Sequence, residues 1–291
     1  MAQIDTLSIF QKGWNFSQYG PGNRLVYHLQ GCNLRCSWCS NPEGMNASGT
    51  LMVNQAKLVP SVCPHGAITG TINRTICSRC MTKECVTVNR NEGIRLSAAS
   101  CSINELIKEV TGAKSLFHSG GGVTLSGGEP TMQFDGVRTF LEALKAMEIN
   151  TAIETNGTHP HLSELFPLID TVIIDLKHYD DDVAAAVTGS PMTAVIANIA
   201  AAARTKTTVL VRITLIPGFN SRADDIRRFA GVLGCLPIQN IQFEVLAYHE
   251  YGKVKWEQCG MAYHERLPGE AIPLRQAETI FRDRGLNVIT T

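Results

Sequence analysis

Apolar residues from position 102 onward follow two alternating patterns. Short continuous apolar runs, typical of buried strands, are separated by stretches in which apolar side chains recur every three or four residues, as in helices. The first helix of this region begins with a capping box, in which Ser102 precedes Glu105 by three positions. The strands predicted here and just upstream are 24–30, 123–126, 151–154, 171–176, 208–215 and 240–246. The predicted helices are 103–110, 132–147, 161–168, 180–186, 192–203, 223–233 and 273–284.

Strands that alternate with helices indicate parallel β/α units, and continuously apolar strands fit a sheet that is buried on both faces. Six strands are too few for a closed eight-stranded barrel. The pattern leaves two architectures open, a partial barrel and an open doubly wound sheet.

Unusual polar residues stand at the carboxyl ends of the predicted strands, where ligands bind in parallel β/α folds. One pocket could therefore collect residues that are far apart in the sequence. They are Cys32, Gly127, Gly128, Glu129, Glu154, Thr155, Asn156, Gly157, Asp175, Lys177, Arg212, Thr214 and His249.

Composition narrows the chemistry. The 26 Lys+Arg and 26 Asp+Glu residues cancel without basic runs, which disfavours nucleic acid as a partner. No apolar run reaches the roughly 18 residues of a membrane span, and the N-terminus lacks a signal pattern, so we expect a cytoplasmic protein. Eight of the ten cysteines lie between positions 32 and 101. In a cytoplasmic chain, such clustering favours metal binding or catalysis over disulfides.

Cys32, Cys36 and Cys39 are spaced C-x3-C-x2-C in a loop directly after the first predicted strand. Three thiolates on a short loop can hold three corners of a cubane iron–sulfur cluster, with one iron left open to another ligand. A zinc site is the alternative, although structural zinc usually has four protein ligands and Ser40 stands where a histidine could have completed the set.

A second group of cysteines lies between the first strand and the first helix. Cys63 precedes a proline, and Cys77, Cys80 and Cys85 follow it, in the manner of a reduced bacterial ferredoxin motif. Four thiols suffice for one closed auxiliary cluster or, alternatively, for a zinc knuckle. Its role would be electron relay or partner docking, and the sequence favours neither. The remaining cysteines, Cys101, Cys235 and Cys259, are interpreted as small apolar residues.

The chain resembles the radical S-adenosylmethionine (SAM) enzymes, and more narrowly the activating enzymes of glycyl radical enzymes. The resemblance spans residues 20 to about 260. The segments that carry it are Gly20–Arg24, Gln30–Cys32, Cys36–Pro42, Gly120–Pro130, Glu154–Gly157, Asp175–Lys177, Ile216–Asn220 and His249–Lys253.

The resemblance implies an α/β fold, a partial (β/α)6 barrel with a small ferredoxin-like insert. Residues 1–45 would form the first strand and cluster loop, 46–100 the insert, and 101–291 the rest of the barrel. A [4Fe–4S] cluster on Cys32, Cys36 and Cys39 would bind SAM and cleave it to a 5′-deoxyadenosyl radical. That radical would take a hydrogen from a glycine α-carbon of a partner, a glycyl radical enzyme. An electron donor such as flavodoxin or ferredoxin would supply the electron.

The resemblance also implies roles at the strand ends. Gly128 would bond the methionine amino group, Trp38 would pack on the adenine, and His249 would reach the adenosyl group. Arg212 interrupts an apolar strand and therefore needs a polar partner, either SAM or a structural salt bridge. A monovalent cation would map onto Glu154, Thr155 and Asp175, with the backbone of Ile173. The other residues assigned to SAM are Ser40, Gly127, Glu129, Asn156, Leu176 and Lys177.

Two departures from the family pattern are visible. Tyr19 replaces an acidic residue near the expected entry of the partner's glycine loop, and the insert has cysteines for one cluster where many relatives have two. Two further functions remain open: a radical SAM enzyme that acts on a small molecule, and an iron–sulfur electron-transfer protein.

Overall fold

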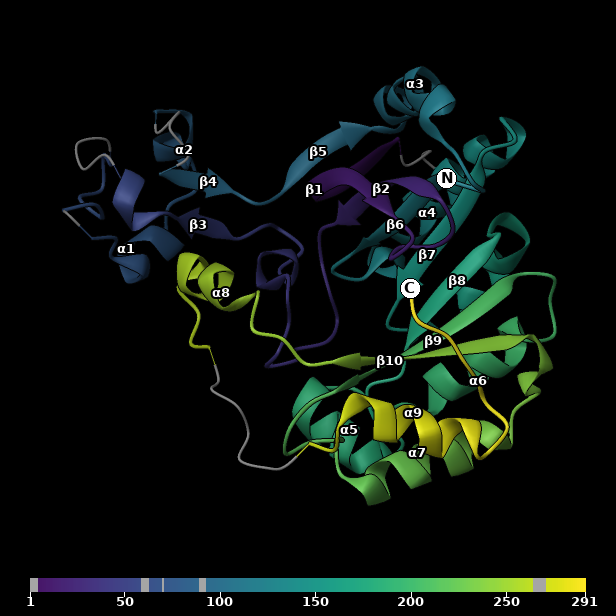
Figure 1. The fold of residues 1–291 in the computed structure, drawn as a ribbon. Helices are drawn as coiled ribbons and strands as arrows, with labels where there is room; N and C mark the ends of the chain where they lie inside the picture. Colours follow the sequence, from purple (N-terminus) through teal and green to yellow (C-terminus); the bar gives the residue numbers. More distant parts are fainter. Residues whose placement is uncertain (1–4, 59–62, 70, 89–92, 264–270) are drawn as a thin grey trace.

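A computed structural model describes residues 5–58, 63–69, 71–88, 93–263 and 271–291. Its centre is a run of six parallel strands, each paired with the next one along the chain (Figure 1). All six strands predicted from the sequence are confirmed to within one or two residues. They are β2 (Asn23–Leu29), β6 (Gly122–Gly127), β7 (Asn150–Thr155), β8 (Thr171–Asp175), β9 (Thr208–Leu215) and β10 (Ile241–Ala247).

The strand order resolves the two architectures that the sequence left open. The sheet runs β11-β10-β9-β8-β7-β6-β2-β1-β5, so the order never reverses as it does in a doubly wound sheet. The two edge strands, β5 and β11, do not pair with each other among the described residues. The fold is therefore an open barrel, as the partial-barrel prediction requires.

Three strands at the two edges were not predicted. They are β1 (Thr6–Phe16), β5 (Ala99–Ser102) and β11 (Asn287–Val288). The long strand β1 runs antiparallel to β2 and also pairs with β5, so it joins the N-terminus to the chain that returns from the cysteine-rich region.

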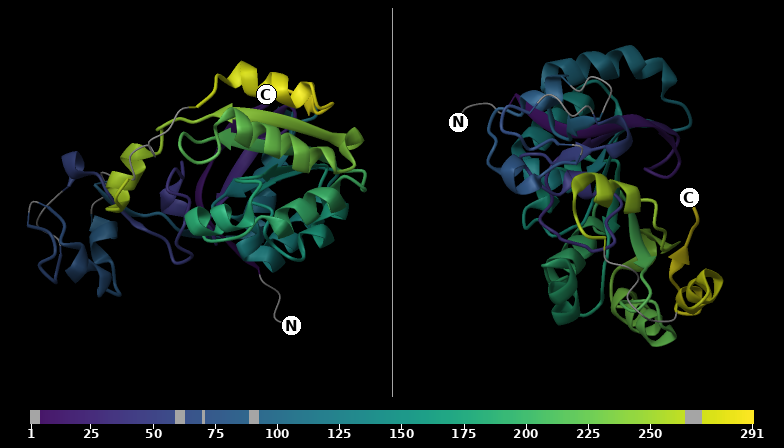
Figure 2. Two further views of the ribbon diagram at one scale, coloured as in Figure 1. Left: turned by 90° about the horizontal axis from the view of Figure 1, so that it is seen from below. Right: turned by 90° about the vertical axis from the view of Figure 1, so that its left-hand side faces the viewer.

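Helices cover the outer face of the sheet (Figure 2). The capping box at Ser102 is confirmed, with the Glu105 N–H donating to the Ser102 Oγ at 3.2 Å. The helix expected at 161–168 is a 3-10 helix, η6 (Leu162–Leu168), and contains Pro167. The α-helices are α3 (Ile103–Ala113), α4 (Phe134–Ala146), α5 (Asp181–Thr188), α6 (Thr193–Ala202), α7 (Ala223–Gly234), α8 (Lys253–Cys259) and α9 (Leu274–Arg282).

Short elements make up residues 46–100, which we call the insert. Its two-stranded sheet pairs β3 (Leu51–Val53) with β4 (Ile94–Leu96), and two helices of five residues, α1 (Arg74–Ser78) and α2 (Glu84–Val88), lie beside it. A small separate core of Ile68, Cys85 and Ile94 supports them. The insert projects from the sheet and lies against α8 (Figure 1). The other 3-10 turns are η1 (Pro42–Gly44), η2 (Gln55–Lys57), η4 (Lys114–Leu116), η5 (Pro130–Gln133) and η7 (Ile238–Asn240).

No single described helix is long and apolar enough to cross a membrane. Taken together across a bend of 108°, α5 and α6 meet the same criterion of length and composition.

Candidate active site

A cavity of about 520 Å³ opens at the carboxyl ends of the parallel strands. The predicted convergence is observed, because residues from the cysteine loop that follows β2 and from the ends of the other five parallel strands line this one space. Of the residues predicted to bind a cluster or SAM there, those that line it are Cys32, Cys36, Trp38, Cys39, Ser40, Gly127, Gly128, Thr155, Asn156, Asp175, Lys177, Arg212 and His249. Glu129 and Leu176 are the two that do not.

The cysteine loop offers three free thiols to the cavity. Backbone N–H groups already point at two of the sulfurs, from Leu34 to Cys32 Sγ and from Asn41 to Cys39 Sγ, both at 3.4 Å. Burial raises the pKa of Cys32 to about 11 and that of Cys39 to about 12, and it also raises the pKa of Cys36. Unligated thiolates would therefore be costly here, whereas a metal that replaces the protons would suit the site.

Two glycines are required where β6 closely approaches β2 and the start of the cysteine loop. A Cβ on Gly128 would lie 2.3 Å from the Gly31 carbonyl oxygen, and one on Gly127, where φ is +119°, would lie 2.4 Å from the Leu29 nitrogen. The structure thus gives these glycines a packing role, in addition to any contact between their backbone and a ligand.

Glu129 departs from the predicted cofactor contact. Only 1% of the residue is exposed. Its carboxylate accepts from Thr155 Oγ1 at 2.7 Å and from the Asn156 N–H at 2.7 Å, as well as from the N–H and hydroxyl of Thr131. These donors satisfy both oxygens, so Glu129 positions the loop after β7 rather than facing the cavity.

Leu176 is the second departure. Its side chain is fully buried in the main core, and its N–H donates to the Arg212 carbonyl at 2.9 Å. The flanking residues Asp175 and Lys177 form an ion pair of 2.9 Å at the cavity wall. Burial opposes the charge on Lys177, but the Asp175 carboxylate outweighs it and raises the pKa of the amine. An ammonium group thus stays charged beside Cys36 and Cys39.

Arg212 has structural partners, which was one of the two predicted possibilities. Its guanidinium donates to Glu154 at 2.6 Å and to Glu244 at 2.8 Å, and the Ser126 hydroxyl donates to the second oxygen of Glu154. Sequence reasoning missed Glu244, although an acidic residue within the apolar run 240–246 was a visible signal. Arg212 and Lys177 form ion pairs with Glu154 and Asp175, two of the residues assigned to the monovalent cation, and that site stays a prediction.

Aromatic rings line the wall and mouth of the cavity. Trp38 packs on Phe219 with ring centroids 4.8 Å apart, and His249 stacks on Tyr251 at 4.3 Å. Tyr19 also lines the cavity, edge-on to His28. Burial, and then the Glu154 carboxylate, raise the pKa of the Tyr19 phenol, so this side chain is neutral.

Helix α8, absent from the predicted elements, fastens the cysteine loop from outside. The Trp256 indole donates to the Cys39 carbonyl at 2.8 Å, and Lys255 bridges Asn41 Oδ1 at 2.7 Å and the buried Glu43 at 2.9 Å. A Cβ on Gly252 would lie 2.8 Å from the Cys39 carbonyl oxygen.

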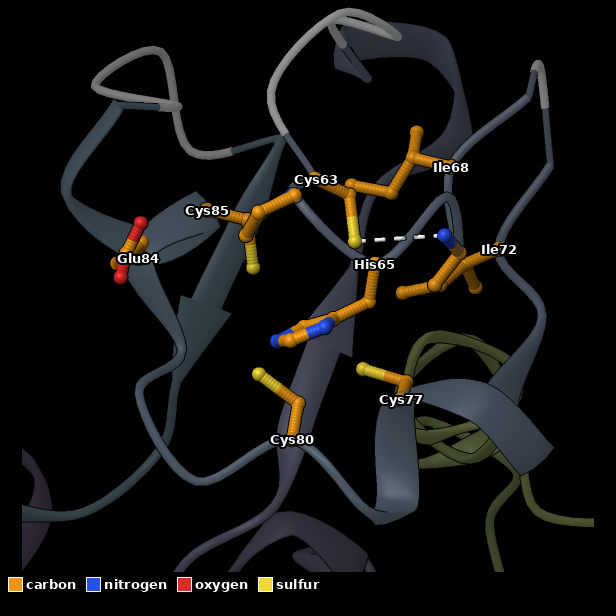
Figure 3. Close-up of a pocket in the computed structure, with 10 residues that line it drawn as sticks. Cys63, His65, Ile68, Ile72, Cys77, Cys80, Glu84 and Cys85 are labelled. Atoms are coloured by element: carbon orange, nitrogen blue, oxygen red, sulfur yellow. Dashed lines mark hydrogen bonds between the residues drawn. The ribbon is translucent and has the colours of Figure 1, made fainter.

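The insert brings its four cysteines together. Cys63, Cys77, Cys80 and Cys85 line a small second cavity with His65, and Figure 3 shows their sulfurs turned toward one another. Sequence reasoning did not single out His65. Among the described residues, no three Cys, His, Asp or Glu side chains are placed to hold a single metal ion.

Comparisons with known proteins agree on one group. The sequence profile described as "Radical SAM superfamily" matches residues 26–230. The chain is 30% identical to the isethionate sulfite-lyase activating enzyme of Desulfovibrio desulfuricans, over 89% of this chain and 87% of that one. It is 29% identical to the 4-hydroxyphenylacetate decarboxylase activating enzyme of Clostridioides difficile, over 92% and 90%. The fold is similar to that of a radical SAM methyltransferase from Sphaerobacter thermophilus, with a TM-score of 0.55, 13% identity, and coverage of 100% of this chain and 74% of that one.

Proposed function

Because this chain belongs to the radical SAM superfamily, we propose that it is an activating enzyme that installs a glycyl radical on a partner enzyme. The carrying observation is the strand-end cavity. It gathers the three free thiols of the cysteine loop with strand-end polar groups, in a space of about 520 Å³ that is large enough for a small-molecule ligand.

Cys32, Cys36 and Cys39 would hold the [4Fe–4S] cluster, and the cavity beside them would hold SAM. The fit rests on the donor set: one buried and two partly buried thiols, two of which already accept backbone N–H bonds, next to the charged Lys177. When bound, these two groups would together supply the chemistry, a one-electron reductive cleavage of SAM that yields a 5′-deoxyadenosyl radical able to take the glycine hydrogen.

The protein's own side chains orient the ligand and limit its freedom. Lys177, held by Asp175, offers a fixed positive charge to a carboxylate, and Trp38 offers an aromatic face to the adenine. Glu129 orders Thr155 and Asn156 at the wall, while His249 and Tyr251 lie at the mouth. The buried wall keeps water and competing hydrogen donors away.

For the insert we propose one auxiliary [4Fe–4S] cluster on Cys63, Cys77, Cys80 and Cys85. The ferredoxin-like spacing of these cysteines supports a cluster over a zinc knuckle. The four thiols share one cavity, where they would be the closed ligand set of that cluster.

The test starts from anaerobically reconstituted protein, reduced and mixed with SAM. We expect 5′-deoxyadenosine by chromatography and about eight irons per chain. Adding a glycyl radical enzyme should then give a glycine-centred doublet in electron paramagnetic resonance (EPR). Candidate partners are the decarboxylases and the sulfite-lyase named for the relatives.

The matched control is the same partner with its radical glycine replaced by alanine, which should give no doublet. If no 5′-deoxyadenosine forms, both radical SAM functions are wrong and the electron-transfer function remains. If it forms but none of the partners gains a radical, a small-molecule substrate is favoured instead.

A further inference from the structure

The insert carries a charge that the rest of the chain does not. Residues 46–100 contain six Lys+Arg and two Asp+Glu, a net charge of +4, whereas the whole chain is neutral and the remainder is therefore at −4. Such an asymmetry attracts an oppositely charged protein to one region of a neutral molecule.

Two of these basic residues, Arg79 and Lys83, share one loop of the insert with an exposed apolar residue, Met81; we call this loop, residues 79–83, the tip. Arg79 is exposed and forms no salt bridge with any described residue, and Met81 is 92% exposed. Between them stands Cys80, whose thiol lines the small cavity of the insert. An exposed apolar residue flanked by charges next to a redox centre is the kind of surface that small, transient electron-transfer contacts use.

The opposite side of the insert leads to the cysteine loop. Three residues before Cys77, Arg74 donates from its guanidinium to the Gln258 carbonyl of α8 at 2.7 Å. Two residues earlier on that helix, Trp256 donates to the Cys39 carbonyl. Contacts through α8 therefore connect the insert to the cysteine loop, while α1 and α2 of the insert lie away from the barrel at the far end of the molecule (Figure 1).

We propose that the Arg79–Lys83 tip is the docking surface for an acidic one-electron carrier protein. The inference rests on the proposed function, because it requires a cluster in the insert. The carrier would be oxidised by one electron, the cluster that Cys63, Cys77, Cys80 and Cys85 would hold would be reduced by it, and the cluster on Cys32, Cys36 and Cys39 would receive that electron next. The mouth of the strand-end cavity stays free for the polypeptide partner.

The test measures reduction rather than turnover. Oxidised holoenzyme is mixed anaerobically with a reduced acidic bacterial ferredoxin, and cluster bleaching is followed by stopped-flow absorbance. We expect the second-order rate constant to fall about tenfold between 20 mM and 500 mM salt. Arg79→Glu should lower it about tenfold at 20 mM, and Arg79→Lys should not.

Two controls isolate the surface. Lys108→Glu makes the same charge change at an exposed position on α3 and should leave the rate within twofold. Reduction by photoreduced deazariboflavin, a small uncharged reductant, should be equal in all variants. Anisotropy of labelled, oxidised ferredoxin should show the same weakening for Arg79→Glu without any electron transfer.

Three results would overturn the proposal: no salt dependence, equal losses in Arg79→Glu and Lys108→Glu, or weaker binding of the glycyl radical enzyme with ferredoxin reduction unchanged. The last would make the tip a surface for the polypeptide partner. Failure of the proposed function is seen separately, as about four irons per chain or as no 5′-deoxyadenosine with the small reductant.

Discussion

The strand-end cavity and the insert both gather cysteines, but they are supported in different ways. The cavity rests on six parallel strands whose apolar side chains are almost all fully buried in one large core. In its described residues, the insert has two strands of three residues and two helices of five, and its separate core consists of Ile68, Cys85 and Ile94 with a few partly buried apolar side chains packed against it. The first site is therefore held by the fold, whereas the second needs its ligand to hold it.

This difference follows from burial and metal-coupled folding. A core of three residues contributes only a few kcal/mol of burial, against an entropy cost of about 1–2 kcal/mol per ordered residue. Metal ligation can supply the deficit, because binding to thiolates in the folded form alone adds to folding free energy. One of the three core residues, Cys85, is itself a proposed ligand. It therefore belongs both to the core of the insert and to the proposed metal site.

The largest expected effect is the complete loss of SAM cleavage in Cys36→Ala. The barrel should stay folded, with the unfolding free energy within about 1–2 kcal/mol of the wild type, because the sheet does not depend on the cluster. Product chromatography and thermal unfolding measure the two quantities. Cys101→Ala is the matched control and should retain activity; full cleavage by Cys36→Ala would refute the assignment.

In the insert, Cys77→Ala should remove both metal and local order. Iron should fall from about eight to about four per chain. Amide hydrogen exchange should rise in the described residues 63–88 and stay unchanged in the parallel strands. Cys235→Ala, at an exposed position outside the insert, should change neither quantity. Unchanged exchange in an iron-depleted insert would contradict the comparison, because the insert would then fold by itself.

Arg212→Met should lower the free energy of unfolding even in protein that holds no cofactor. The variant leaves the buried Glu244 and the partly buried Glu154 without their cation, and breaking such a group costs about 3–5 kcal/mol. Denaturant unfolding of metal-free protein measures it. Arg227→Met, which removes a surface pair with Asp224, should cost under about 1 kcal/mol. Similar costs for the two would mean that the ion network does not stabilise the barrel.

Much of the barrel could be predicted from sequence because buried parallel strands are continuous apolar runs. The same rule failed for β1, where polar and apolar residues mix because the strand lies near an edge of the sheet. It also failed for α8, whose seven residues are too few for a helical period to show.

The site residues, too, could be predicted only in part. The positions at strand ends predicted which residues converge, because parallel strands place their carboxyl ends together. Glu129 could not be assigned in this way, since its direction depends on Thr131, Thr155 and Asn156 after folding. Trp256 was missed because its partner is a backbone carbonyl more than 200 residues away, and the spacing of residues in the sequence cannot predict such a bond.

A smaller, pH-dependent effect is expected inside the barrel at His28. This residue is 8% exposed, its Nδ1 has no partner among the described residues, and burial, with a contribution from Lys255, lowers its pKa to about 4. The unfolded chain binds the proton at about pH 6.5 and the folded chain at about pH 4. The folded state therefore keeps its full free energy of unfolding above pH 6.5, where His28 is neutral in both states, and loses part of it as the pH falls toward 4.

We expect the metal-free wild type to lose up to about 3 kcal/mol more than His28→Leu over this range. Urea unfolding at intervals between pH 7.5 and 4.5 measures the difference. Parallel pH profiles for the two proteins would show that His28 is not buried neutral. Hydrogen exchange in the insert should be the same in the wild type and in His28→Leu at each pH, because this histidine belongs to the sheet.

The smallest effect is expected where the two regions meet, in Trp256→Phe. The variant keeps an aromatic ring on α8 but leaves the Cys39 carbonyl without its indole donor, which should cost about 1–2 kcal/mol. Trp14→Phe, at a half-exposed position on β1, should cost less than about 0.5 kcal/mol. The EPR spectrum of the cluster on Cys32, Cys36 and Cys39 should change, and that of the insert should not. If both spectra changed together, α8 would be a shared support of the two sites, and the insert would not be the independent, ligand-held unit that its small core indicates.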